Sequence, residues 1–233
     1  MLLAMPPTSQ TLPEMYDAML SAFGHRAWWP SRAGAGTPEG KLEICIGAVL
    51  TQNTNWTNVE KAIGNLQAAG KMSVSALRET TPEALAGLIR PAGYFNVKAR
   101  RLLNLIARVH AEWDEDIAGF LDRPAATLRE ELLSIKGIGR ETADSIILYA
   151  AGRPIFVVDA YTCRVLARHR LISPEDDYEA IRDLIQSALP EDVELWRDFH
   201  AQFVEVGKRH CRPRARCAGC PLEAFPHDID PEP

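Results

Sequence analysis

The chain has 233 residues, of which 46% are hydrophobic and 24% charged, ordinary values for a globular protein of one large or two small domains. Its net charge of −5 and pI near 5.7 argue against a nucleic-acid-binding protein, because such domains are often basic as a whole. No signal-peptide pattern opens the sequence and no apolar run approaches about 18 residues, so we expect a soluble, cytoplasmic protein with no membrane partner.

Apolar residues recur at helical spacing along most of the chain, which predicts an all-α fold. A proline-bearing arm precedes the first predicted helix, residues 13–23. The segment 155–158 is too short for a useful strand and has no partner. The other predicted helices are 42–50, 57–68, 73–79, 82–90, 97–113, 127–134, a helix that begins at Arg140, 160–169, 178–188 and 195–208.

A glycine hairpin, Lys136-Gly137-Ile138-Gly139, joins two of these helices. Glycines allow positive φ and a close approach of the backbone to a partner. Amides at the start of the following helix favour an anion such as a phosphate, and Arg140 adds a full charge there. An ordinary corner between helices is the alternative interpretation.

Basic residues gather on two segments, although the whole chain is acidic. Lys98, Arg100 and Arg101 form the first group, and five Lys or Arg residues between 208 and 216 form the second. The acidic residues concentrate elsewhere, at 175–177 and 191–192. One basic face on an acidic protein is compatible with DNA binding.

An aspartate, Asp159, follows the apolar run 155–158 at the start of a predicted helix. A carboxylate there can act as a helix N-cap, which is a sufficient structural role by itself. It can also stabilise positive charge that develops in a bound substrate.

Three of the five cysteines, Cys211, Cys217 and Cys220, lie within ten residues. Their crowding indicates a metal site more than a disulfide framework.

The order Leu132, Ile135, Gly137, Gly139, then Val158-Asp159 resembles the signature of the helix-hairpin-helix DNA glycosylases of the endonuclease III superfamily. The resemblance extends from about Trp28 to Cys220. It implies two helical lobes with a cleft between them: a helical barrel domain, 36–151, and a second domain, 1–35 with 152–233. It also implies a monomer that flips a damaged base from double-stranded DNA and cleaves its glycosidic bond.

The same resemblance assigns roles to particular residues. The hairpin from Lys136 to Arg140 would grip the DNA backbone through its amides, and Asp159 would sit in the base pocket. Lys98 and Arg101 would contact phosphates, unless they form a solvated basic stripe. Gln52 would fill the gap left by the flipped nucleotide, unless its turn is only a capped corner.

Two further segments are similar to the 3-methyladenine DNA glycosylase III branch of the superfamily: Trp28-Trp29-Pro30 and the string T-Q-N-T-N-W that begins at Thr51. In that branch the first segment lines the base pocket, near a position that we match to Leu42. Enzymes that act on a base hold it between aromatic faces, so one tryptophan would stack on it. A hydrophobic plug under the loop that follows is the alternative.

A glycosylase that also breaks the strand needs an amine for a Schiff base. Endonuclease III has a lysine where this chain has Glu141. The resemblance therefore implies a monofunctional glycosylase, with alkylated purines such as 3-methyladenine as the expected substrate. An endonuclease III-like enzyme for oxidised pyrimidines is one alternative, and a DNA-structure binder without catalysis is another.

The cysteines resemble the [4Fe-4S] loop of the family, whose members have a fourth cysteine about six residues further on. This chain has none there, so His227, or an oxygen of Asp228, would have to complete the ligand set. A three-iron cluster, a zinc ion and a lost site remain alternatives.

Overall fold

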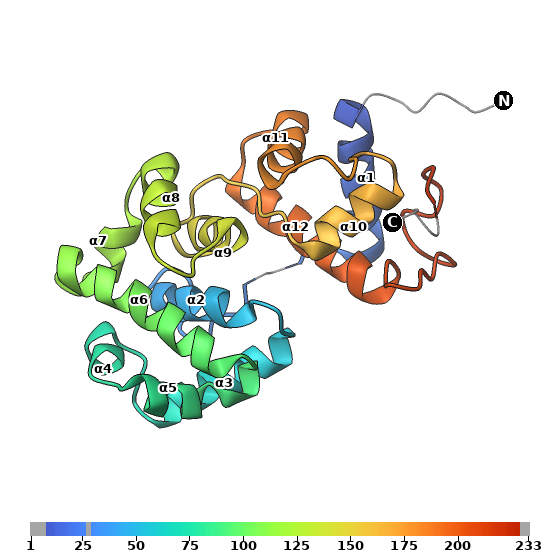
Figure 1. Ribbon diagram of the computed structural model, residues 1–233. Coiled ribbons are helices and arrows are strands. Elements are labelled where there is room, and N and C mark those ends of the chain that lie inside the picture. Colours follow the sequence, from blue (N-terminus) through green and yellow to red (C-terminus); the bar gives the residue numbers. More distant parts are fainter. Residues whose placement is uncertain (1–7, 27–28, 229–233) are drawn as a thin grey trace. The chain divides into compact units, whose positions relative to one another are not determined.

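The computed structural model describes residues 8–26 and 29–228 of the chain, and the regular elements within these ranges are all helical (Figure 1). The predicted all-α class is therefore confirmed. The chain divides into two compact units, Trp29–Arg153 and Met1–Trp28 with Pro154–Pro233. None of the helices in the described ranges has the length and apolar character needed to cross a membrane.

The unit Trp29–Arg153 contains the helices from α2 to η2 and the glycine hairpin. Its elements are α2 (Pro38–Thr51), α3 (Trp56–Ala68), α4 (Val74–Arg78), α5 (Pro82–Leu88), η1 (Arg90–Ala92), α6 (Phe95–Trp113), α7 (Ile117–Leu121), α8 (Ala125–Ser134), α9 (Arg140–Ser145) and η2 (Ile146–Ala150). The centre of the unit is α2, which is buried from Leu42 to Leu50. Thr37 caps its first turn, because its Oγ1 accepts from Gly40 N at 3.0 Å.

The other unit contains α1 (Thr8–Phe23), α10 (Ala160–Arg168), α11 (Tyr178–Ala188) and α12 (Val193–Arg209). Phe156, Phe199 and Phe203 form its aromatic core, with ring centroids 4.6 to 6.4 Å apart. Aspartates cap three of its helices: Asp159 for α10, Asp177 for α11 and Asp192 for α12.

Several helix boundaries differ from the predictions; α2, for example, begins at Pro38 rather than at Leu42, directly after its N-cap Thr37. The first helix begins at Thr8 and contains Pro13, whereas the sequence predicted a start at Pro13. Burial of Leu12, Met15 and Met19 favours the longer helix despite the proline. The short helix α7 was not predicted, because five residues are too few to show a helical period.

A buried ion pair joins the two helices that flank the hairpin. Arg129 on α8 donates from Nε to Asp144 Oδ1 at 2.7 Å and from Nη2 to Oδ2 at 3.2 Å. The Asp144 side chain on α9 is fully buried. Because a bidentate pair fixes direction as well as distance, it holds α8 and α9 in a defined orientation around the hairpin.

Candidate functional site

The hairpin between α8 and α9 has the backbone that its glycines predicted. Gly137 has φ +100°, a conformation that disfavours any side chain. The Ile138 side chain is buried and its N–H donates to Ile135 O at 3.0 Å, so this residue anchors the turn. Within the described part of the chain, the N–H groups of Gly137 and Gly139 have no acceptor. These two amides are the ones available to an anion.

Gln52, at the end of α2, is bonded to the hairpin. Its Nε2 donates to Gly137 O at 3.2 Å and to Thr142 Oγ1 at 2.8 Å, and its Oε1 accepts from Arg101 Nη1. The Arg101 side chain also packs beneath Gly137. Gln52 therefore positions the hairpin in this structure. Its predicted entry into the duplex stays a prediction, and would require that these bonds break.

The predicted phosphate contact by Lys98 is wrong in this structure. Lys98 is 1% exposed, and its Nζ donates to Leu50 O at 2.8 Å and Ala92 O at 2.7 Å. Burial, with the nearby Arg101, lowers its pKa to about 8. Lys98 is buried because position 98 lies on the same face of α6 as Leu102, Leu105 and Val109. The prediction was based on its charge and did not take this apolar face into account. Lys98 satisfies carbonyls at the ends of α2 and η1 that would otherwise lack donors.

An exposed aromatic that the sequence analysis missed lies at the start of α6. Tyr94 is 71% exposed and has φ +46°. Helical spacing places Tyr94, Val97, Arg101 and Asn104 on one stripe. Asn104 Nδ2 donates to Lys136 O at 2.8 Å, so the far end of this stripe contacts the hairpin. Tyr94 is seven residues from Arg101, about 10 Å along the helix axis.

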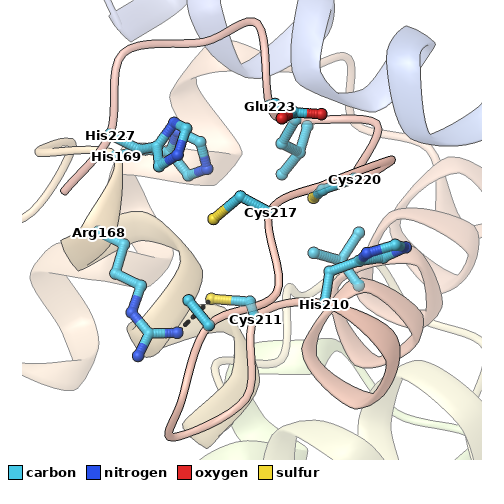
Figure 2. Close-up of a pocket in the computed structure, with 11 residues that line it drawn as sticks. Arg168, His169, His210, Cys211, Cys217, Cys220, Glu223 and His227 are labelled. Atoms are coloured by element: carbon cyan, nitrogen blue, oxygen red, sulfur yellow. Dashed lines mark hydrogen bonds between the residues drawn. The ribbon is translucent and has the colours of Figure 1, made fainter. Parts of the chain in front are cut away.

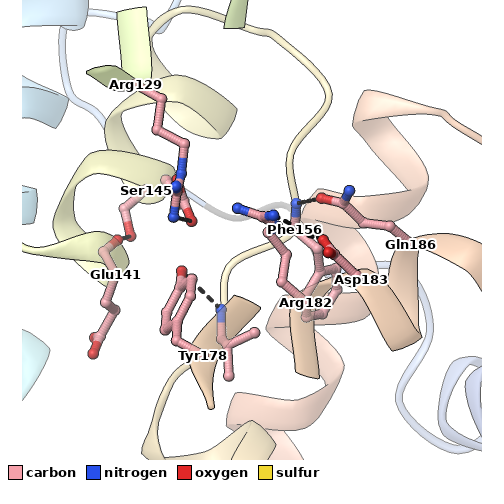
Figure 3. Close-up of polar contacts among 10 residues, drawn as sticks. Arg129, Glu141, Ser145, Phe156, Tyr178, Arg182, Asp183 and Gln186 are labelled. Atoms are coloured by element: carbon pink, nitrogen blue, oxygen red, sulfur yellow. Dashed lines mark hydrogen bonds and ion pairs between the residues drawn. The ribbon is translucent and has the colours of Figure 1, made fainter. Parts of the chain in front are cut away.

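The first turn of α9 carries no lysine. Glu141 is exposed, and its carbonyl accepts from Ser145 Oγ at 2.7 Å (Figure 3). Arg140 beside it is exposed, and so is Lys136 on the hairpin. Position 141 thus presents a carboxylate on the helix that follows the hairpin.

Asp159 is the partly buried N-cap of α10. Its Oδ1 accepts from Thr162 N at 2.7 Å and from Thr162 Oγ1 at 2.9 Å. Its Oδ2 lies 3.6 Å from Nε2 of His200 on α12, and the side chains of both residues are about one-tenth exposed. Burial by itself would raise the pKa of Asp159. The His200 imidazole and the Thr162 donors outweigh burial and hold that pKa below its usual value.

Side chains of α11 hold the segment that leads to Asp159 (Figure 3). Gln186 Oε1 accepts from Phe156 N at 2.8 Å, and Tyr178 OH accepts from Val158 N at 3.4 Å. The segment is buried but belongs to no sheet, so side chains supply the acceptors that a neighbouring strand would otherwise provide. The position of Asp159 is therefore fixed on both sides, by α11 before it and by α10 after it.

The structure describes only part of the segment Trp28-Trp29-Pro30. Trp28 lies outside the described residues. Trp29 packs edge-on against Trp56 with centroids 5.1 Å apart and lies 5.2 Å from the Tyr149 ring, over Gly47. These contacts agree with the plug interpretation for Trp29. Pro30 is exposed and Leu42 is buried in α2, and their place in a base pocket stays a prediction.

The three C-terminal cysteines line one cavity (Figure 2). The cavity is partly open to solvent and is also lined by His169, His210, Glu223 and His227. Burial, with the neighbouring thiols Cys217 and Cys211, raises the pKa of Cys220. No three Cys, His, Asp or Glu side chains in the described ranges converge as the ligands of a single ion.

The donors around this cavity nevertheless suit thiolate-bound iron. A cluster takes one ligand at each iron, so its ligands surround a volume rather than one point. The imidazoles of His169 and His227 each direct Nδ1 to a carbonyl, Pro226 O at 3.1 Å and Phe225 O at 2.7 Å. Because a carbonyl only accepts, Nδ1 carries the proton and Nε2 keeps its lone pair. Three thiols and two such imidazoles are an adequate donor set.

Comparisons with known proteins agree with this geometry. Residues 46–191 match the model of the HhH-GPD superfamily of base excision DNA repair proteins. A protein of Methanocaldococcus jannaschii that carries the name of a DNA repair glycosylase is 41% identical over 91% of this chain and 94% of its own length. Endonuclease III of Thermotoga maritima is 32% identical over 78% of this chain and 80% of its own length.

Two solved structures share the fold. The 3-methyladenine DNA glycosylase of H. pylori, bound to 1,N6-ethenoadenine, has a TM-score of 0.70 at 28% identity, and the match covers 87% of this chain and 97% of that one. An endonuclease III–DNA complex has a TM-score of 0.76 at 24% identity, over 93% and 94% of the two chains. The matched family region contains the hairpin and Asp159. The chain therefore belongs to the HhH-GPD superfamily of base excision DNA repair proteins, the helix-hairpin-helix superfamily of endonuclease III.

Proposed function

We propose that this protein is a DNA glycosylase that takes a damaged base out of duplex DNA and hydrolyses its N-glycosidic bond. The observation that carries the proposal is Asp159, a partly buried carboxylate that faces His200 and whose pKa is held below its usual value. Thr162 occupies Oδ1, and Oδ2 faces His200. The group is therefore ionised at neutral pH and rigidly placed.

Cleavage of an N-glycosidic bond builds positive charge on the sugar. A fixed carboxylate stabilises that charge best where water is largely excluded, because the attraction is then less screened. The same group can accept a proton from the attacking water, as in glycoside hydrolysis. Asp159 meets both requirements. The lowered pKa of Asp159 also argues against a DNA binder without catalysis, because a side chain that only caps a helix does not need a negative charge.

DNA contact is proposed for the hairpin and for the exposed stripe of α6. The free amides of Gly137 and Gly139 suit a phosphate, with Lys136 and Arg140 beside them. Tyr94, farther along the stripe, suits stacking against bases of an opened duplex. Arg101 supports this surface from beneath Gly137.

Alkylated purines such as 3-methyladenine are the proposed substrates. The likeness to the H. pylori 3-methyladenine glycosylase supports this choice. The test is release of free base, measured by chromatography, from duplexes that carry either alkylated purines or oxidised pyrimidines. We expect release from the first set and none from undamaged duplex. Faster release of oxidised pyrimidines would favour the alternative that the likeness to endonuclease III suggests. Release from neither set would contradict the glycosylase proposal.

We also propose that the enzyme does not break the strand. The carboxylate of Glu141 cannot form a Schiff base, and Lys98 is buried among carbonyls. The product should be an intact abasic site that breaks only after alkali treatment, and borohydride should trap no covalent protein–DNA adduct. Gel electrophoresis of the two reactions measures both expectations.

Matched variants sharpen the trapping experiment. Glu141→Gln removes a charge without supplying an amine, so it should stay at the wild-type background. Efficient trapping by the unmodified protein that Lys136→Ala abolishes would show that Lys136 is a nucleophile and that the enzyme is bifunctional.

Finally, we propose that Cys211, Cys217 and Cys220 hold an iron–sulfur cluster. When bound, the cluster would tie the C-terminal loop to α10 and α12 and supply no step of base removal. Arg168 already holds this loop from α10, by donating to Cys211 Sγ at 3.1 Å (Figure 2). It also donates to Arg212 O at 2.6 Å and to Pro213 O at 3.0 Å.

A further inference from the structure

The C-terminal tail is fastened to the end of α10 at three consecutive residues. Asp228 N donates to Arg168 O at 2.8 Å. His169 Nδ1 donates to Pro226 O at 3.1 Å. The Arg170 guanidinium binds both carboxylate oxygens of Asp228, from Nε at 2.6 Å and from Nη2. Residues 168–170 thus hold residues 226–228 on either side of His227.

Arg170 directly follows the C-cap residue of α10. Its φ of +57° belongs to a Schellman turn, in which Arg170 N donates to Ala167 O at 3.0 Å and Leu171 N donates to Leu166 O at 2.9 Å. This turn ends α10 and places the Arg170 side chain beside Asp228. The carboxylate of Asp228 is fully engaged by Arg170, so it is a poor candidate for the ligand that a fourth cysteine would otherwise supply.

His227 is the side chain that this attachment presents to the cysteine cavity. Its ring is 5.3 Å from that of His169, and both line the cavity with the three cysteines (Figure 2). The bond from Nδ1 to Phe225 O leaves Nε2 as the free acceptor. No other partner of that nitrogen is found within the described ranges.

The opposite wall of the cavity is held by the same end of α10. The Arg168 side chain binds the cysteine loop at 211–213, while its backbone carbonyl binds the tail at Asp228. Arg164, one turn earlier, donates from Nε to Cys211 O at 2.6 Å. One helix end therefore sets the separation between the cysteines and His227.

We propose that His227 is the fourth ligand of the cluster, through Nε2, with Cys211, Cys217 and Cys220 on the other irons. His169 and Arg170 are positioning residues that hold the tail in place. This inference rests on the cluster part of the proposed function and not on the glycosylase activity. Replacement of a thiolate by a neutral imidazole makes the ligand set less negative, so the cluster has a higher reduction potential than a four-cysteine cluster would.

The test is Mössbauer spectroscopy and metal analysis of the full chain, purified without oxygen and reconstituted with iron-57 and sulfide. In the wild type we expect one iron in four to give its own quadrupole doublet. His227→Cys should keep the iron content, make the four irons alike and lower the midpoint potential. His227→Ala should lose about one iron in four. His169→Gln keeps a donor for Pro226 O and removes the other imidazole, so it should leave the distinct doublet unchanged.

Several outcomes would overturn the proposal. A wild-type spectrum that His227→Ala leaves unaltered would mean that water or another group completes the site. Loss of the distinct doublet in His169→Gln, with His227→Cys unchanged, would assign the ligand to His169. A chain that takes up zinc, or no iron, would overturn the cluster itself. None of these readouts depends on base release, so a failed ligand assignment and a failed glycosylase proposal are distinguishable.

Discussion

Asp159→Asn should lower the rate of base release by about 100-fold or more, because it removes the negative charge that stabilises the cationic sugar. Asparagine is as good an N-cap as aspartate, so the bond from Thr162 N and the start of α10 should survive. The measurement is single-turnover base release with enzyme in excess, alongside DNA affinity by fluorescence anisotropy. Affinity should stay within a few-fold of wild type, since the amides proposed to bind phosphate are unchanged.

A matched control is available in the same unit. Asp177 caps α11, accepting from Ala180 N at 2.9 Å, but it is exposed, and no histidine among the residues described by the structure pairs with it. Asp177→Asn should therefore leave base release unchanged. Near-normal turnover of Asp159→Asn would reduce Asp159 to a structural cap and remove its catalytic assignment.

The lowered pKa of Asp159 also predicts a pH dependence. A carboxylate whose pKa is lower in the folded state stabilises the fold above its unfolded pKa, and this contribution is lost as pH falls through the folded pKa. Base release should likewise persist on the acid side until the pH passes below the usual carboxyl range. In Asp159→Asn this contribution to stability and its loss in acid should both be absent.

Gly137→Val should weaken binding to damaged and undamaged duplex alike. We expect the dissociation constant of each to rise by about tenfold or more, and tenfold corresponds to about 1.4 kcal/mol of binding free energy. Positive φ costs a residue with a side chain about 1–2 kcal/mol. The added Cβ would also lie 2.3 Å from Arg101 Cγ. Arg101 would have to move, which would disturb its bond to Gln52 and the position of the hairpin amides. A shallower salt dependence of the affinity should accompany the loss, since fewer phosphates are contacted.

Two other glycines separate DNA contact from folding. Gly139 has an ordinary φ and nothing within 4 Å of an added Cβ, so Gly139→Ala leaves the fold intact and only blocks close approach of a phosphate. It should lose affinity without losing thermal stability. Gly87→Ala, on the exposed face of α5, should change neither DNA affinity nor base release. A loss in Gly137→Val confined to one lesion would indicate a base-pocket role for the hairpin instead.

The sequence by itself determined the helical class, the hairpin and the N-cap position of Asp159. Apolar spacing sets which faces of helices are buried, and it does so locally. Glycines at 137 and 139 permit the turn, and an aspartate directly before a helix caps it whatever its distant neighbours are. These features depend on residues close together in the chain, so a single sequence suffices to predict them.

Only the tertiary structure decided which charged side chains face solvent. Lys98 and Arg101 look alike in a helical pattern, yet Lys98 satisfies carbonyls at the ends of α2 and η1 while Arg101 lies beneath Gly137. Gln52 binds the hairpin, 85 residues further along the chain. Such partners depend on how distant segments pack. A charged side chain can be buried only where groups such as these carbonyls accept its hydrogen bonds.

The partners of Asp159 and His227 were also decided by packing. His200 lies 41 positions after Asp159, on α12, and no spacing rule connects them. The attachment of residues 226–228 to the end of α10 spans 57 to 60 positions. Helical period and capping act over a few residues, whereas these contacts depend on how α10, α12 and the tail fold against one another, and only three-dimensional packing specifies that.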